Sequence, residues 1–467
     1  MKRLAAFACA LGLALAATAR SQDVTGRIDT SGDIEAQIRY LEQFVGGDLP
    51  AEKQAVMYRW LADLYTSVGR LDDAQRAHET ILGHFPYDVG ARNAYALFLL
   101  DHRDDPAAAD SVLGDAVEAA RTAPNTPVFL GQTHALHARA LHELGRDEEA
   151  LEAVDRALAL MDADAAEDAL RIRARALESL GRQAEAEEAF VQLIGLECGS
   201  NPDDVSALIA LMTAQTGSVD AARVDARIEA AIVDARARRS ERIRRDGAEV
   251  VVIPGEGGAR LEGTLRRGKE SGAILFVPDL GGRRASFAPY AQLFALDGLT
   301  TFAIDPRGHG DSRSDLLPSF AGMPQEQREK IPADIAAAYR HVRETLDVPA
   351  ERIVVLAEGG ASAVVEQTLQ QRGIAAVVVH LSPVFDPQDR DILSALEFRA
   401  PRPTLLVASD EDAFAMRSVS LLTDSYPSPA TEARIVSAAG HGLLVLREPK
   451  NFAIVANWIR ATLGLPR

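Results

Sequence analysis

Two hydrophobic patterns divide the chain near residue 245. Before that point, apolar residues recur three and four positions apart, as they do along one face of a helix. After it, short runs of β-branched residues alternate with stretches of helix length. We therefore predict an all-helical domain over 31–245 and a domain of alternating strands and helices over 246–467.

The helical half repeats itself. Alanines that are each followed by a similar pattern stand at intervals of 34, 42, 36 and 36 residues: Ala62, Ala96, Ala138, Ala174 and, in a weaker copy, Ala210. Glycines that would end the first helix of a pair stand at 69, 145, 181 and 217. This pattern resembles the tetratricopeptide repeat, whose period is about 34 residues. The resemblance implies an all-α superhelix with a concave face for a protein or peptide partner, or an array that packs only against the second half of the chain.

Eight apolar runs of the second half predict strands. They lie at 250–253, 261–265, 273–277, 300–304, 353–356, 376–380, 404–407 and 433–436. The first two read as a hairpin, and helix-length segments separate most of the others. Such alternation predicts a mainly parallel sheet flanked by helices.

Three segments of this half resemble the α/β-hydrolases. They are the strand and glycine turn of 274–282, the loop Asp305-Pro306-Arg307-Gly308-His309-Gly310-Asp311-Ser312, and the pair Asp412 and His441 near the end. The resemblance implies that Asp412 and His441 are the acid and base, that His309 is structural, and that a backbone N–H near Leu280 helps to bind the oxyanion. Pro278-Asp279 replaces the family's usual His-Gly.

The nucleophile of that family is a serine on a sharp strand-to-helix turn, G-x-S-x-G. Ala357-Glu358-Gly359-Gly360-Ala361 matches the turn, which places glycine at its tip and leaves the Gly360 N–H as an oxyanion donor. Ser362, three residues beyond the tip, is a non-standard nucleophile candidate, and Glu358 is a candidate base or nucleophile. Removal of the serine removes the covalent route.

Two functions remain open. One is a scaffold or binding protein whose hydrolase-like domain is catalytically silent. The other is an esterase-like enzyme in which Asp412 and His441 activate water, or in which Ser362 attacks, on a small ester-like ligand.

The composition excludes some partners. The chain has 467 residues and a net charge of -18, which argues against nucleic acid and against a polybasic membrane anchor. Lys2 and Arg3, the apolar run 4–17 and Ala17-Thr18-Ala19 predict a signal peptide over 1–19, followed by a linker over 20–30. A periplasmic or secreted protein without a membrane span is expected.

Other residues suggest no further chemistry. No metal, dinucleotide or P-loop motif is present, so no cofactor is predicted. His134, His137 and His142 are expected to be packing or solvated residues, and the arginines at 236, 238, 239, 242, 244 and 245 a solvated helix face. Cys198, the one cysteine after the signal, is read as a small apolar residue, with a reactive thiol or an intermolecular bridge as alternatives.

Overall fold

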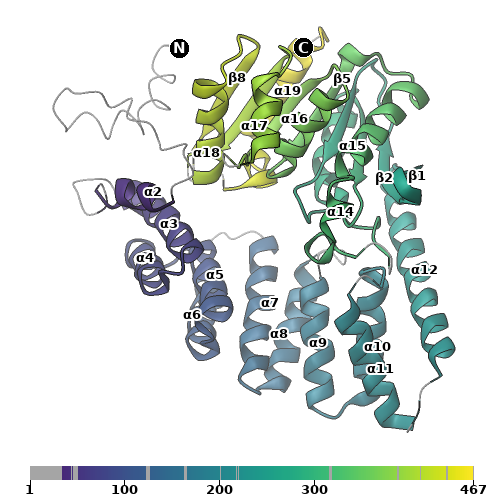
Figure 1. The fold of residues 1–467 in the computed structure, drawn as a ribbon. Helices are drawn as coiled ribbons and strands as arrows, with labels where there is room; N and C mark the ends of the chain where they lie inside the picture. The colour runs from purple at the N-terminus through teal and green to yellow at the C-terminus, as the bar shows by residue number, and fades with distance from the viewer. Residues whose placement is uncertain are drawn as a thin grey trace. The chain divides into compact units, whose positions relative to one another are not determined.

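The computed structural model describes residues 34–43, 45, 51–122, 127–161, 166–199, 201–216, 218, 220–314, 318–386, 389–410, 412–437 and 440–465 (Figure 1). The predicted signal peptide, its cleavage after Ala19, the linker and the turn at Gly217 lie outside these residues. Two compact units divide between Ala237 and Arg238, inside helix α12 (Ala221–Arg245). The predicted domain boundary, between residues 245 and 246, falls instead at the C-terminal end of α12. Among the described residues, no helix is both long and apolar enough to cross a membrane.

The first unit consists of helices in the part of it that the structure describes. Their bounds are α2 Ile34–Glu42, α3 Ala51–Ser67, α4 Leu71–His84, α5 Val89–Phe98, α6 Pro106–Thr122, α7 Pro127–Glu143, α8 Asp147–Leu160, α9 Glu167–Ser179, α10 Gln183–Leu196 and α11 Pro202–Thr216, before α12. Neighbours in the chain pack as pairs, α3 with α4, α5 with α6, α7 with α8 and α9 with α10. Contacts of α7 with α9 and of α5 with α7 join successive pairs.

Glycines end the first helix of three of these pairs. Gly69, Gly145 and Gly181 have φ values of 76°, 72° and 70°, in the left-handed region that glycine adopts without penalty. The next N–H in each case bonds back to the helix, as that of Arg70 does to the Tyr65 carbonyl at 2.8 Å. The alanines at 62, 96, 138 and 174 are fully buried between helices, whereas Ala210 is exposed. The weaker fifth copy therefore departs from the other four in its packing.

The second unit is built on one sheet of eight strands. They are β1 Glu249–Pro254, β2 Arg260–Arg266, β3 Ala273–Val277, β4 Thr300–Asp305, β5 Ile353–Glu358, β6 Val377–Leu381, β7 Thr404–Ser409 and β8 Thr431–Val436. Their order is β1-β2-β4-β3-β5-β6-β7-β8, with β1 and β2 antiparallel and β3 to β8 parallel. All eight predicted strands are confirmed, and this sheet has the arrangement expected of the α/β-hydrolase fold.

Helices cover both faces of the sheet. They are α13 Ala288–Leu296, α14 Gln325–Arg328, α15 Ile331–Arg340, α16 Ala361–Gln371, α17 Arg390–Glu397, α18 Ala413–Ser420 and α19 Pro449–Thr462. Successive strand residues face opposite sides, so Leu275 packs in one apolar core with α15 and α16, and Ile274 in the other with α13 and α19. A parallel sheet buried on both faces requires the near-continuous apolar strands that the sequence carries.

Candidate active site

The strand-to-helix turn lies between β5 and α16, as the sequence predicts. Its tip, Gly359, has a φ of 52°, and its N–H donates to the carbonyl of Leu381 at 2.9 Å. A residue with a side chain would pay about 1–2 kcal/mol for this left-handed backbone. The turn therefore has a left-handed backbone at its tip, where glycine is favoured and no side chain is present.

The carboxylate of Asp279 fills the space above this glycine. An ideal Cβ built on Gly359 would lie 2.5 Å from both Oδ1 and Oδ2 of Asp279, where ordinary contact begins at 3.4 Å. The Asp279 Oδ1 atom accepts the N–H of Gly360 at 2.7 Å and the N–H of Leu280 at 2.8 Å. These are the two backbone donors that the sequence assigns to an oxyanion hole. A carboxylate oxygen therefore already accepts both of the N–H groups that were predicted to bind an oxyanion.

A network of backbone contacts fixes the loop that carries Asp279. The N–H of Gly282 donates to the Asp279 carbonyl at 2.7 Å, and the N–H of Gly281 donates to Nε2 of His309 at 2.9 Å. The other ring nitrogen of His309, Nδ1, bonds the Arg307 carbonyl at 2.8 Å. Burial lowers the pKa of His309, which favours the neutral ring that can accept at Nε2. His309 is thus structural, as predicted.

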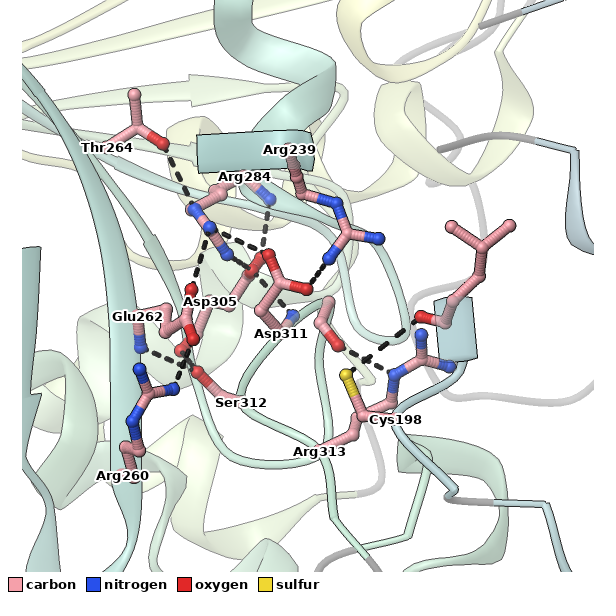
Figure 2. Close-up of polar contacts among 12 residues, drawn as sticks. Cys198, Arg239, Arg260, Glu262, Thr264, Arg284, Asp305, Asp311, Ser312 and Arg313 are labelled. Carbon is pink, nitrogen blue, oxygen red and sulfur yellow. Dashed lines mark hydrogen bonds and ion pairs between the residues drawn. The ribbon is translucent and has the colours of Figure 1, made fainter. Parts of the chain in front are cut away.

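A second group of polar contacts holds the loop after β4 (Figure 2). The buried Arg284 side chain bonds Asp305, Glu262 at 3.1 Å and Asp311 at 2.8 Å. The backbone N–H of Arg284 donates to Asp305 Oδ1 at 2.6 Å. Because these charges are buried and paired, they lock the 304–312 loop in one conformation beside the Asp279 loop.

The prediction of a solvated helix face is wrong for one arginine of the basic run 236–245. Arg239, expected on a solvated helix face, is buried and forms an ion pair with Asp311, also drawn in Figure 2. A buried arginine requires such an acidic partner, since an unpaired charge would be costly there. Arg238, Arg244 and Arg245 are exposed, as predicted.

Asp412 and His441, the predicted acid and base, are in contact. Nδ1 of His441 and Oδ2 of Asp412 are 2.6 Å apart. Asp412 also caps α18, since its Oδ1 accepts the N–H of Ala415 at 3.1 Å. The hydrogen bond to Asp412 is the largest cause of a raised pKa for His441, and the negative charges of Asp279 and Glu358 act in the same direction. The His441 side chain is 47% exposed, although its Nδ1 is paired with the buried Asp412.

Glu358 joins the segment that follows His441 to the turn after β5. Its Oε1 accepts the N–H of Leu443 at 2.9 Å, and a Cβ on Gly442 would overlap this same oxygen. Burial raises the pKa of Glu358, and the charge of Asp279 adds to that rise. The Gly442 N–H donates to Oγ of the buried Ser382 at 2.8 Å. These contacts bring Glu358, Gly359, Gly360, Leu280, Asp412 and His441 to one place.

Ser362 is not part of this cluster. It lies in the first turn of α16, its side chain is fully buried, and its Oγ has no hydrogen-bond partner. The site residue that sequence reasoning missed is Asp279. Its signal was the replacement of His-Gly by Pro278-Asp279, but the sequence does not show where that carboxylate points.

Two of the three histidines singled out in the first half pair with aspartates, and the cysteine is buried. His137 contacts Asp110 at 2.7 Å and His142 contacts Asp147 at 2.5 Å. Cys198 is buried after the end of α10, with a φ of 56°. No cluster of three or more histidine, cysteine or acidic residues suited to a metal ion occurs in the described part of the chain.

The solved structures similar to this protein each match about half of the chain. No family model matches the chain, and no curated protein matches its sequence. Among solved structures, an esterase of Pyrococcus furiosus is 13% identical, covering 46% of this chain and 91% of its own, with a TM-score of 0.38. An α/β hydrolase from Penicillium is 13% identical, covering 47% of this chain and 99% of its own, with a TM-score of 0.39. A post-proline cleaving enzyme from Rickettsia typhi is 14% identical, covering 47% of this chain and 38% of its own, with a TM-score of 0.35.

The order and directions of the strands, a mainly parallel sheet with an antiparallel pair at one edge, are those of the α/β-hydrolase fold. The second half of the chain has the α/β-hydrolase fold, with glycine at the tip of the turn after β5 and an aspartate carboxylate that accepts the N–H groups of Leu280 and Gly360.

Proposed function

We propose that this chain is an exported binding protein whose hydrolase-fold domain has lost serine-type acyl transfer. A tetratricopeptide-like array over 31–245 would offer its concave face to a protein or peptide. The observation that carries the loss of acyl transfer is the pair of hydrogen bonds from Leu280 and Gly360 to Asp279 Oδ1.

Acyl transfer needs an attacking oxygen and donors that are ready for a developing negative charge. Here the attacking side chain is absent at Gly359, and both donors already hold a carboxylate. A second anionic oxygen could not form beside that carboxylate without displacing it. The two changes depend on one another, because any side chain at 359 would overlap Asp279. Glycine at the tip is thus what allows the carboxylate to enter.

The helical half supports the binding role. Its pairs of helices have buried alanines at four equivalent positions and left-handed glycine turns at three. Paired helices that each cover the apolar face of the next generate an extended curved surface, which such arrays use to bind peptides. The net charge of -18 favours a partner that is not itself strongly acidic.

A serine-directed fluorophosphonate probe tests the catalytic part of this proposal. The full chain should remain unlabelled at concentrations that label an ordinary esterase to completion. Stoichiometric labelling at Ser362 would overturn the loss of serine chemistry.

Peptide selection followed by hydrogen exchange tests the binding part. A peptide selected on the full chain should protect backbone amides within 51–216 and leave those of the strands unchanged. Protection confined to 249–465 would refute a repeat-borne binding face.

The N-terminal sequence of the protein recovered from cells tests export. The mature chain should begin at Arg20. A chain that retains Met1 or residues 2–19 would contradict it.

A second candidate function is ester hydrolysis by activated water. The intact contact between His441 and Asp412, at 2.6 Å, favours it. It predicts slow turnover of an activated ester that His441→Ala abolishes. Equal residual rates in the wild type and in the variant would end this alternative.

A further inference from the structure

Four buried polar side chains meet between α16, β6 and the loop that leads into β7. They are Glu366 of α16, His380 of β6, and Arg399 and Arg402 of the loop. The side chains of Glu366 and His380 are fully buried, and those of Arg399 and Arg402 are only 3% and 6% exposed. Charged side chains are rarely so buried unless their charges are balanced.

The charges of this cluster do not balance. Glu366 is the only described carboxylate within ion-pair distance of either arginine, and its Oε1 also lies 3.1 Å from Nε2 of His380. Arg399 Nη1 is 3.7 Å from Oε1, and Arg402 Nη2 is 3.9 Å from Oε2, which are both too long for hydrogen bonds. One negative and two positive charges leave a net charge of at least +1, whatever the protonation state of His380.

Both arginines also keep a buried donor without an acceptor. Nη1 of Arg399 and Nη1 of Arg402 have no hydrogen-bond partner in the part of the chain that the structure describes. Their other contacts are to neutral oxygens, from Arg399 Nη2 to Thr431 Oγ1 at 3.0 Å and from Arg402 Nε to the Ala400 carbonyl at 3.4 Å. Burial lowers the pKa of Arg402, Glu366 opposes this, and the charge of Arg399 adds to the fall. The two cations therefore lie close enough to repel one another.

We propose that this cluster binds one small monovalent anion, such as chloride, through Nη1 of Arg399 and Nη1 of Arg402. The anion would supply the missing negative charge and an acceptor for both donors. A water molecule could satisfy hydrogen bonds here, including that of Glu366 Oε2, which also lacks a partner, but it brings no charge. Because an uncompensated buried charge costs more than an unmet hydrogen bond, charge balance favours the anion.

The bound anion would stabilise the elements that carry the turn at Gly359. α16, which contains Glu366, begins two residues after this glycine. His380 precedes Leu381, whose carbonyl accepts the Gly359 N–H at 2.9 Å. An anion in the cluster thus joins α16, β6 and the loop before β7. This structural ligand goes beyond the proposed function, which does not use these residues.

Urea unfolding at constant ionic strength tests the site. Chloride replaces gluconate, an anion too large for a buried site, around the full chain with Trp60→Phe, so that Trp458 in α19 reports the hydrolase unit. If the folded chain binds one chloride and releases it on unfolding, the unfolding equilibrium constant should fall about tenfold for each tenfold rise in chloride above the dissociation constant. An equilibrium constant that is the same in chloride and in gluconate would overturn the proposal.

Three variants in the same background locate the binding site. Arg402→Met keeps an apolar stem and removes the excess charge, so the chloride dependence should disappear. Glu366→Gln keeps an oxygen for His380 and removes a charge that repels the anion, so the dependence should begin at about tenfold lower chloride. Arg390→Met, at an exposed arginine of α17, should keep the wild-type dependence.

A folded Arg402→Met chain with the wild-type chloride dependence would contradict the assignment. If that variant does not fold, Glu366→Gln decides, because an unchanged or weaker dependence there would show that the anion does not bind beside this carboxylate. None of these results would bear on the loss of serine chemistry, which the fluorophosphonate probe reads independently.

Discussion

A side chain restored at position 359 should compete with Asp279 for one space. Gly359→Ser introduces a Cβ about 1 Å too close to both carboxylate oxygens, since it would lie at 2.5 Å where ordinary contact begins at 3.4 Å. The carboxylate must swing away and lose the N–H groups of Leu280 and Gly360. Hydrogen bonds to a charged group are worth about 1.5–3 kcal/mol each, partly regained from water at this half-buried site. The left-handed backbone adds about 1–2 kcal/mol. Together these terms predict a loss of about 3–5 kcal/mol for the single variant.

A double-mutant cycle isolates the competition. Asp279→Ala alone should cost about 2–3 kcal/mol, because it leaves two backbone donors without their carboxylate. In the Gly359→Ser background it should cost almost nothing, since the carboxylate has already been displaced. The cycle should therefore show a coupling free energy of about 2 kcal/mol. If the stability losses of the two single variants instead sum to that of the double variant within about 0.5 kcal/mol, the two side chains do not compete for one space.

The assay must report the hydrolase unit alone. The chain has two tryptophans, Trp60 in α3 and Trp458 in α19. A Trp60→Phe background leaves Trp458 fluorescence as a reporter of that unit during urea unfolding. Each variant is then compared in this background, with the slope of the transition checked for two-state behaviour.

Two other predictions follow from the surroundings of the site. The pKa of His441, followed by NMR, should lie above its ordinary value, and Asp412→Asn should lower it while keeping a cap on α18. Because the folded pKa is raised, the stabilisation from this pair is fully present below the unfolded pKa and is lost as pH rises through the folded pKa, so Asp412→Asn should cost more stability at low than at high pH. Ser362→Ala should be neutral or slightly stabilising, because its Oγ is buried without a partner, whereas Ser382→Ala should cost about 1–3 kcal/mol by stranding the Gly442 N–H.

Each of these predictions has a clear contrary result. A His441 pKa unmoved by Asp412→Asn would show that the two side chains do not pair in solution. A larger loss of stability from Ser362→Ala than from Ser382→Ala would place Ser362 in a contact that the structure does not contain.

The strands and the elbow could be predicted because their signals are local. Buried parallel strands need continuous β-branched runs, and a tight left-handed tip such as that of Gly359 needs small neighbours. The order of Asp412 and His441 along the chain was equally readable, and the structure brings them into contact.

The destination of the Asp279 side chain could not be predicted in this way. It depends on a space left by a glycine far along the chain, and no local pattern records that space. The burial of Arg239 could not be predicted for the same reason, because its partner Asp311 lies in a loop far along the chain. Ala210 has the spacing of the repeat but is exposed. Spacing alone does not show whether a neighbouring helix covers that face.

The most direct test of the account is fluorophosphonate labelling of the Gly359→Ser/Asp279→Ala double variant. If Asp279 fills the place of the nucleophile and its oxyanion donors, the folded double variant should be labelled at position 359, and His441→Ala should suppress that labelling. Gly359→Ser alone should be labelled far more slowly, because the displaced Asp279 carboxylate remains near the donors, where its negative charge opposes that of the oxyanion. A folded double variant that remains unlabelled, or a single variant labelled as fast as the double, would contradict the account.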